Sequence, residues 1–529
     1  MIKKLKKFGD RDFLKKIVEA CQKYVNSWFE ISGTDESPVL RNMHESSVLR
    51  NTDDSSVPLK NTYMTIKFCG AAREVTGSCH LVTLDSGFTI LLDCGLYQGN
   101  SPQMKKFNDE WLFNPATIDC MVLSHAHIDH TGRIPKLVKD GFATTIYATH
   151  ATRALSAIML LDSAGIQERD AEYDNKKLVK KGEIPDAQPL YTTEDVQKAM
   201  KMFASFGYDR WFRIHSDVEV LYTDAGHILG SACVTLKITE RGKTSMVGFT
   251  GDIGRPNRPI LRDPQPMPEV DYLLCESTYG DRLHEAEPEE LDRFLSIIKE
   301  TCIERKGKVI IPAFSVGRTQ EIVFMLDKLV NEGRLPLIPV IVDSPLAVDA
   351  TDVFIEHPEC FDDEMHTYML KDPNPFGFKN LTFIRGVEES KALNSSTEPC
   401  VIIASSGMAN AGRVKHHLFN NIDNPRATIL IVGYASPQTP AGQLRDGAKH
   451  LWLFGEDKMV NARVEIMDSF SAHADYKEIM DVIANQKGRL KKLYLVHGDY
   501  EVQQIFQKTL YTEGFRNIEI PELGQVVEL

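Results

Sequence analysis

The sequence has no apolar run close to the ~18 residues that a membrane-spanning helix requires, which predicts a protein without a membrane span or membrane partner. It also has no CxxC pair, and ten cysteines in 529 residues are too few for a disulfide scaffold. The basic N-terminus lacks the apolar core of a secretory signal. We therefore expect reduced thiols and a cytoplasmic location.

Basic residues are in the minority as well. The chain has 61 Lys and Arg against 74 Asp and Glu, a formal net charge of -13. The electric field of a chain with this negative net charge does not attract polyanions in general. Any binding of nucleic acid must therefore come from local cations or metal ions. The composition is otherwise that of a globular protein, and the length corresponds to about two to four domains.

Residues 1–62 form a segment of their own. Apolar residues recur at helical spacing between Phe13 and Trp28, which predicts one amphipathic helix. Three related stretches then begin at residues 36, 45 and 54. Their Ser, Asp and Asn content predicts a flexible linker.

Two patterns follow this linker. Short apolar runs that predict β-strands, with helical patterns such as residues 192–206, extend over 64–285 and return in 441–529, where ARVEIMD is one such run. Between 286 and 440, the strand patterns KVIIPAF, PVIVDSP, CVIIASSG and ATILIVGY alternate with helices. That alternation indicates a parallel sheet covered by helices. The sequence therefore predicts an α/β protein with a separate α/β insert.

The most informative segment is MVLSHAHIDHTGRIP, residues 121–135. Directly after an apolar strand it places His125, His127, Asp129 and His130. Imidazole nitrogens and carboxylate oxygens are the ligands that a zinc site uses. Because alternate residues of an extended segment point to the same side, His125 and His127 can reach one ion together. The following turn can direct the other two residues to a second ion.

Five more residues stand where an apolar strand meets a Gly- or Ser-rich loop, the usual position of site residues on a rigid scaffold. They are Asp93, His227, Asp252, His473 and His497. Any one of them alone is more simply a turn or capping residue. Together with the histidine-rich segment, they indicate a metal site.

The arrangement of these residues resembles a known family. Asp93, the HAHIDH segment, His227 and Asp252 resemble the four signature motifs of the metallo-β-lactamase superfamily. Three later segments resemble motifs A, B and C of its β-CASP branch: CESTYGDRLH with Glu276, SFSAHAD with His473, and LVHGD with His497. PAFSVGRTQE, at 312–321, is also typical of that branch. The resemblance covers roughly residues 64–529 and is closest to RNA-cleaving members.

The resemblance implies an αββα metallo-β-lactamase sandwich formed by residues 64–285 and 441–529, with a β-CASP domain inserted at 286–440. It also implies two zinc ions, bridged by Asp252, with Asp93 orienting their ligands. The ligands of the first ion are His125, His127 and His227, and those of the second are Asp129, His130 and His497.

The same resemblance implies a reaction. A hydroxide activated by the two metals cleaves an RNA phosphodiester bond and leaves 5′-phosphate and 3′-hydroxyl ends. His473 acts as the general acid, and Glu276 holds its ring in position. The expected substrate is single-stranded RNA, and the expected cleavage is endonucleolytic. A 5′-to-3′ exonuclease activity beside it is left open.

The insert supplies candidate phosphate contacts: Arg318, Ser405, Ser406, Arg413 and Lys415. Three other functions compete with the ribonuclease. DNA-repair members of the branch carry Val at the position of His497, small-molecule hydrolases lack the insert, and non-catalytic paralogues have lost metal ligands. These differences favour the ribonuclease. The oligomeric state stays open, with a homodimer as one alternative.

Overall fold

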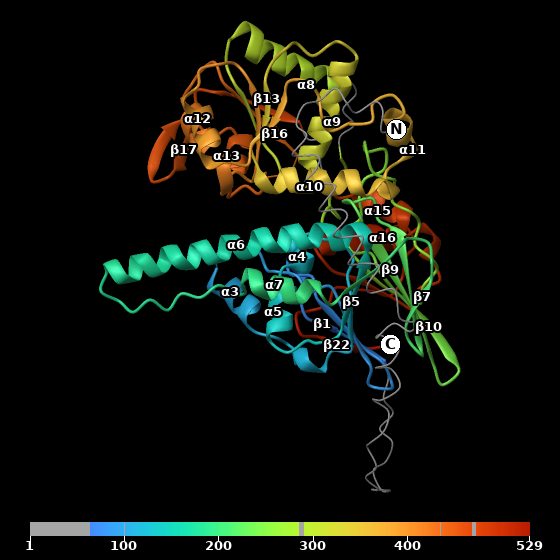
Figure 1. Cartoon of the computed structure of the whole chain (residues 1–529). Coiled ribbons are helices and arrows are strands. Elements are labelled where there is room, and N and C mark those ends of the chain that lie inside the picture. Colours follow the sequence, from blue (N-terminus) through green and yellow to red (C-terminus); the bar gives the residue numbers. More distant parts are fainter. Residues whose placement is uncertain (1–63, 100, 285–289, 434, 468–471) are drawn as a thin grey trace, which may run out of the picture. The chain divides into compact units, whose positions relative to one another are not determined.

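The computed structural model describes residues 64–99, 101–284, 290–433, 435–467 and 472–529 (Figure 1). The helix and linker predicted for residues 1–62 lie outside these ranges. Within the described ranges, no helix combines the length and the apolar character needed to cross a membrane.

Two seven-stranded sheets form the first domain. The first sheet has the order β22 (Val526–Glu528), β1 (Thr65–Phe68), β2 (His80–Thr83), β3 (Thr89–Leu92), β4 (Cys120–Val122), β5 (Thr145–Thr149) and β6 (Phe203–Phe206). The second has the order β21 (Ile518–Glu519), β20 (Lys492–Leu495), β11 (Tyr272–Cys275), β10 (Lys243–Phe249), β9 (Ala232–Glu240), β8 (Val218–Asp224) and β7 (Phe212–His215).

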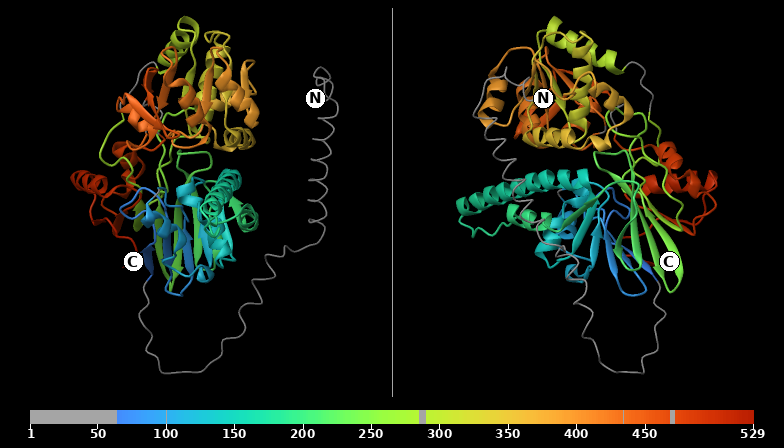
Figure 2. Two further views of the ribbon diagram at one scale, coloured as in Figure 1. Left: turned by 90° about the vertical axis from the view of Figure 1, so that its left-hand side faces the viewer. Right: turned by 45° about the vertical axis from the view of Figure 1, so that its right-hand side comes forward.

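The inner faces of these sheets share one core, in which Phe68 and Val122 of the first sheet meet Tyr222 and Leu274 of the second. Helices α5 (Ile134–Lys139) and α7 (Thr193–Met200) cover the outer face of the first sheet. Helices α15 (Tyr476–Val482) and α16 (Tyr500–Thr512) cover that of the second (Figure 2). Each strand can bury both faces because alternate side chains point to opposite sides. The predicted αββα sandwich is therefore confirmed.

The insert contains a six-stranded, fully parallel sheet. Its order is β14 (Leu381–Phe383), β13 (Val340–Val342), β15 (Val401–Ala404), β12 (Val309–Pro312), β16 (Thr428–Val432) and β19 (Arg463–Met467). Its helices are α8 (Glu290–Ile298), α9 (Arg318–Asn331), α10 (Pro345–Glu356), α11 (Asp363–Met369), α12 (Val387–Ser395), α13 (Gly412–Asn421) and α14 (Pro440–Arg445).

Both faces of this sheet are buried, which is why its central strands read as continuous apolar runs. Val309 and Ile311 pack on the side of α8, α9 and α10. Ile310, between them, packs on the side of α13 and α14. The parallel sheet predicted for the insert is confirmed.

Two details differ from the sequence-based prediction. Strand β19 pairs with β16, so the sheet of the insert continues beyond residue 440, where the domain boundary was expected. The segment FASF, predicted as the end of a helix, forms β6 instead, because its backbone pairs with the edge strand β5. In both cases the pairing of strands that are distant in sequence determines the structure. Neither helical spacing nor order along the chain predicts such a pairing.

The insert packs directly on the first domain. Ile228 and Ile260 of the first domain belong to the same apolar cluster as Val316 and Ala350 of the insert. An antiparallel backbone bridge between Leu261 and Phe361 adds a second connection. These contacts place the insert beside the loop that carries His227.

Candidate metal centre

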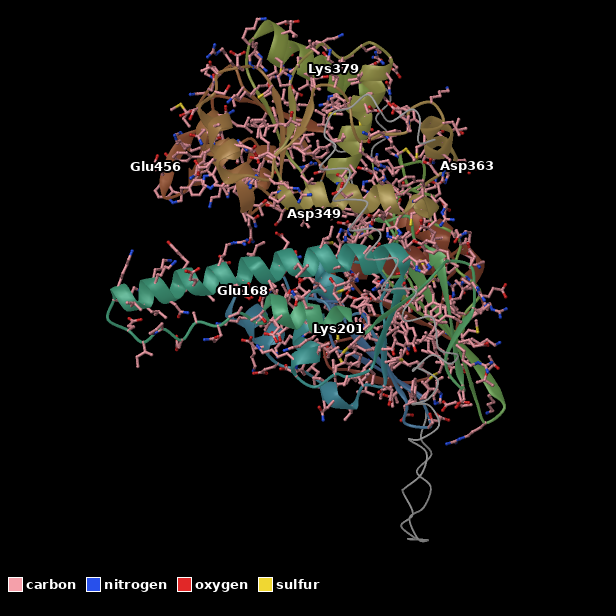
Figure 3. All side chains as sticks on the ribbon, viewed as in Figure 1. Glu168, Lys201, Asp349, Asp363, Lys379 and Glu456 are labelled. Carbon is pink, nitrogen blue, oxygen red and sulfur yellow. The ribbon has the colours of Figure 1, made fainter. Side chains whose placement is uncertain are left out.

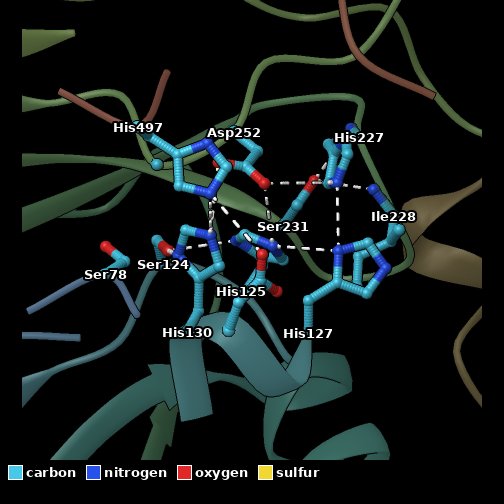
Figure 4. Close-up of polar contacts among 12 residues, drawn as sticks. Ser78, Ser124, His125, His127, His130, His227, Ile228, Ser231, Asp252 and His497 are labelled. Atoms are coloured by element: carbon cyan, nitrogen blue, oxygen red, sulfur yellow. Dashed lines mark hydrogen bonds and ion pairs between the residues drawn. The ribbon is translucent and has the colours of Figure 1, made fainter. Parts of the chain in front are cut away.

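The predicted ligands gather at one edge of the sandwich because parallel strands end there together. Strand β3 is parallel to β4, and strands β10, β11 and β20 are parallel to one another. The residues that follow these strands therefore meet. They are Asp93, the His125–His130 segment, Asp252, Glu276 and His497. Figure 4 shows most of them converging, together with His227 from the loop between β8 and β9.

The first group of donors consists of His125, His127, His227 and Asp252. Nδ1 of His127 lies 3.2 Å from Nε2 of His125 and 3.1 Å from Nε2 of His227 (Figure 4). Oδ2 of Asp252 lies 3.4 and 3.6 Å from the same two Nε2 atoms. Two nitrogen ligands of a tetrahedral zinc ion, each at about 2.05 Å, are ~3.3 Å apart. The spacing of the first group therefore fits the ligands of one zinc ion.

The second group consists of Asp129, His130 and His497. The Nε2 atoms of His130 and His497 are 3.2 Å apart, and Oδ2 of Asp129 lies 3.6 Å from Nε2 of His497. The other carboxylate oxygen of Asp252, Oδ1, lies 3.3 Å from Nε2 of His130. Among the described residues this buried oxygen has no hydrogen-bond partner. Asp252 thus offers one oxygen to each group, as a bridging ligand does.

The charge states of Asp252, His125 and His227 suit cation binding. Burial opposes ionisation of Asp252, but the imidazoles of His130, His497 and His125 hold the pKa of that carboxyl well below its usual range. Burial and the neighbouring histidines lower the pKa of His125 and of His227 well below the usual value. Neutral imidazoles and ionised carboxylates are the forms that bind a metal.

A second layer of side chains fixes the imidazole rings through their remaining nitrogens. Asp93 accepts a hydrogen bond from Nδ1 of His130 at 2.7 Å and from the backbone N–H of Ser124 at 2.8 Å. The hydroxyl of Ser124 lies 3.1 Å from Nδ1 of His125, and that of Thr278 lies 3.1 Å from Nδ1 of His497. The orienting role expected for Asp93 is therefore geometrically reasonable. Sequence reasoning missed Ser124 and Thr278, although Ser124 directly precedes the HAHIDH segment.

Gly95 allows the histidine-rich turn to approach the end of β3. A Cβ at Gly95 would lie 1.6 Å from the backbone oxygen of Asp129. The backbone N–H of Ser78 donates a hydrogen bond to that same oxygen at 2.8 Å. A side chain at residue 95 would therefore push the turn that carries Asp129 and His130 out of position.

Thr278→Val is expected to weaken zinc binding by about 10- to 100-fold without unfolding the protein, because it removes the hydroxyl beside Nδ1 of His497 and retains the side-chain shape. Zinc titration against a chromophoric chelator measures this change, with thermal unfolding as the control. Zinc affinity equal to that of the unsubstituted protein would contradict the orienting role of Thr278.

His473 and Glu276 lie next to the first group. Nδ1 of His473 is 3.4 Å from Oε2 of Glu276, and Glu276 in turn accepts a hydrogen bond from the backbone N–H of Ile253 at 2.5 Å. Burial opposes protonation of His473, but the carboxylates of Glu276 and Asp252 raise its pKa to about 9. These carboxylates therefore favour the protonated form of the ring. Asp475 follows His473 by two residues. It caps α15 by accepting hydrogen bonds from the N–H groups of Lys477 and Glu478.

The five candidate phosphate contacts lie in the insert and have different surroundings. The Arg413 guanidinium donates to buried Asp343 at 2.6 Å and to the carbonyl of Arg385 at 2.7 Å. The Arg318 guanidinium is buried and donates to Glu321. Both arginines thus have partners within the chain.

The serines and the lysine differ from the two arginines. The hydroxyl of Ser405 lies 2.9 Å from that of Ser344, which is 3.1 Å from that of Ser315. Ser406 follows in the same loop and donates a hydrogen bond to Asn410. Lys415 forms no ion pair with any carboxylate in the described ranges. Serines 405 and 406 therefore belong to a polar loop cluster, and Lys415 has no acidic partner among the described residues.

Comparisons with known proteins agree with this geometry. Residues 81–246 match the metallo-beta-lactamase superfamily domain, residues 319–444 the Beta-Casp domain, and residues 457–521 the Zn-dependent metallo-hydrolase RNA specificity domain. The last match contains His473 and His497, and its description, together with the donor set, supports a divalent metal.

Three curated relatives align with most of the chain. "Ribonuclease TTHA0252" of Thermus thermophilus is 33% identical over 458 residues, which cover 87% of this chain and 98% of the relative. "RNase J-like protein" of Methanocaldococcus jannaschii is 30% identical, with 84% and 95% covered. "Transcription termination factor FttA" of Methanosarcina mazei is 29% identical, with 83% and 68% covered. The ligand geometry, the matched domains and these relatives together establish that the chain belongs to the β-CASP branch of the metallo-β-lactamase superfamily.

Proposed function

We propose that this protein is a metal-dependent ribonuclease that hydrolyses phosphodiester bonds in single-stranded RNA. The observation that carries the proposal is the position of Asp252, whose two oxygens face two separate groups of metal donors beside His473. The match to an RNA specificity domain and the relative named as a ribonuclease support RNA as the substrate. Because that domain and that relative point to RNA, neither a DNA nuclease nor a small-molecule hydrolase is favoured.

The donor set fits two zinc ions. When bound, they would supply a nucleophile from water at neutral pH and neutralise the charge of the phosphate. Within the chain, Asp93, Ser124 and Thr278 keep the imidazoles in the orientation that ligation requires.

His473 is the proposed general acid. Glu276 holds Nδ1 of the ring and favours its protonated form, so Nε2 can deliver a proton to the departing 3′-oxygen. The products would then carry 5′-phosphate and 3′-hydroxyl ends. We propose mainly endonucleolytic action, since an enzyme that positions a phosphate by metals and a general acid does not itself require a chain end.

The proposed path of the RNA crosses the carboxyl edge of the insert sheet. The chain runs from β12 towards one edge of the sheet, to β13, and from β15 towards the other edge, to β16. The direction in which the chain crosses the sheet therefore reverses between the neighbouring strands β12 and β15. Crevices at such reversal points bind ligands in open α/β sheets. The cluster of Ser315, Ser344 and Ser405 lies at this edge and can donate hydrogen bonds to phosphate oxygens. A cytoplasmic location and a homodimer stay predictions.

The proposal predicts that 5′-labelled single-stranded RNA is cleaved in the presence of zinc, that EDTA stops the reaction, and that added zinc restores it. Gel mapping with end-specific enzymes should find 5′-phosphate and 3′-hydroxyl ends, with internal fragments among the earliest products. DNA of matched sequence and a chromogenic lactam serve as controls. Cleavage that continues in EDTA, or DNA hydrolysis as fast as that of RNA, would overturn the proposal.

A further inference from the structure

The hairpin of β17 (His450–Leu453) and β18 (Glu456–Met459) carries an aromatic surface that the chemistry above does not use. Leu451 and Leu453 are buried in the apolar cluster that includes α13 and α14, so the hairpin is firmly attached to the insert. Trp452, between them in the strand, is 70% exposed. An outward-facing tryptophan on a well-anchored strand is a rigid, flat, apolar surface in contact with water.

The tip of this hairpin holds a second aromatic residue in an unfavourable conformation. Leu453 pairs with Glu456, which leaves Phe454 and Gly455 as a two-residue turn with φ of +51° and +84°. Turns of this kind favour Asn or Asp at the first position, whereas a bulky residue rarely adopts a positive φ. Hairpin formation alone therefore does not account for phenylalanine at this position, and the side chain is 48% exposed.

Helix α13 supplies the partners of this ring, two of them polar. The ring of Phe454 lies 4.6 Å from that of His416 and 5.6 Å from that of Phe419, and Nζ of Lys415 lies 4.8 Å from its centroid. In the described ranges no carboxylate pairs with Lys415, whereas Asp457 of the hairpin pairs with His450 at 3.0 Å. Glu456, labelled in Figure 3, is the first residue of β18 and pairs with Leu453. The hairpin thus exposes Trp452 on the face opposite α13 and, at its tip, Phe454 beside a lysine that has no acidic partner among the described residues.

We infer that this hairpin is a stacking platform for the single-stranded RNA substrate, with Trp452 on its outward face and with Phe454, His416 and Lys415 at its tip. Aromatic side chains on β-strands bind unpaired bases by stacking, and a neighbouring lysine contacts the phosphates. The platform rests on the ribonuclease function proposed above, because it binds the same RNA away from the metal donors. Since stacking tolerates every base, the platform contributes affinity and not sequence preference.

Two substitutions test the platform. Trp452→Ala and Phe454→Asn are each expected to raise KM for a single-stranded RNA about fivefold or more, with little change in kcat. Hydrolysis of bis(p-nitrophenyl) phosphate, which is too small to reach the hairpin, should be unchanged. Phe454→Asn creates the Asn-Gly sequence that this turn prefers, which offsets the lost ring contacts with α13, so the protein should stay folded, with a melting temperature close to that of the unsubstituted protein. Weaker binding with an intact fold separates an RNA contact from a structural role.

Matched variants complete the test. Trp211→Ala removes an exposed tryptophan of the first domain and should leave KM unaltered, and Phe454→Tyr should retain the KM of the unsubstituted protein. KM values within twofold of normal for both hairpin variants would overturn the platform. A change from dimer to monomer in Trp452→Ala, measured by light scattering, would instead make the hairpin a protein interface and also overturn it. Absence of RNA cleavage by the unsubstituted protein would count against the proposed function itself.

Discussion

Asp252→Ala is expected to reduce RNA cleavage to less than about 1/1,000 of the normal rate and to remove bound zinc, because this carboxylate faces both groups of donors. No other described side chain is positioned to serve both groups. Its loss would leave the imidazoles of His125 and His130 buried without their shared anion. Plasma mass spectrometry of the purified protein measures zinc per chain, and initial rates on labelled RNA measure activity.

Asp327→Asn is the matched control for this substitution. Asp327 is also a buried aspartate, but it lies in the insert and accepts a hydrogen bond from the hydroxyl of Tyr368 at 2.5 Å. It should retain normal zinc content, whatever its effect on stability. A normal amount of zinc in Asp252→Ala would rule out the bridging role.

His473→Ala is expected to lower kcat on RNA by about 10²- to 10⁴-fold while zinc content stays normal, because the residue supplies a proton and no metal ligand in the proposed reaction. The leaving 3′-alkoxide requires that proton, whereas p-nitrophenolate leaves without one. Hydrolysis of bis(p-nitrophenyl) phosphate should therefore fall much less than cleavage of RNA. Equal losses on both substrates would contradict a general acid.

Glu276→Gln provides a graded comparison for His473. The amide preserves the shape of the side chain but removes the charge 3.4 Å from Nδ1 of His473. Its effect on kcat should be in the same direction and smaller, because the imidazole itself is still present. A larger loss than in His473→Ala would indicate a role for Glu276 beyond positioning, for example as a metal ligand with Asp252.

Much of the fold could be predicted because its strands have strong local signals. The runs around Ile310, Ile402 and Ile429 are apolar on both faces, and only a sheet covered by helices on both sides buries such runs. Strand β6 could not be predicted, because FASF is a strand only through its pairing with β5. The extent of the insert was missed because strand order in a sheet is not encoded in order along the chain.

The metal ligands could be predicted for a similar reason. His125, Asp252 and His497 each follow an apolar strand, and parallel strands bring such positions together. The hydroxyl groups that contact these ligands could not be predicted. Thr278 lies near His497 only because β11 and β20 are neighbours in the sheet, although the two residues are 219 positions apart in sequence. The pairing of Arg413 with Asp343, 70 residues away, was hidden for the same reason.

The central claim is that residues far apart in the chain hold two divalent cations at one edge of the sandwich. Anomalous diffraction at the zinc absorption edge, from crystals grown with zinc, tests it most directly. We expect two peaks about 3.5–4 Å apart on either side of Asp252, one beside His227 and the other beside His497. A single peak, or peaks away from Asp252, would contradict it.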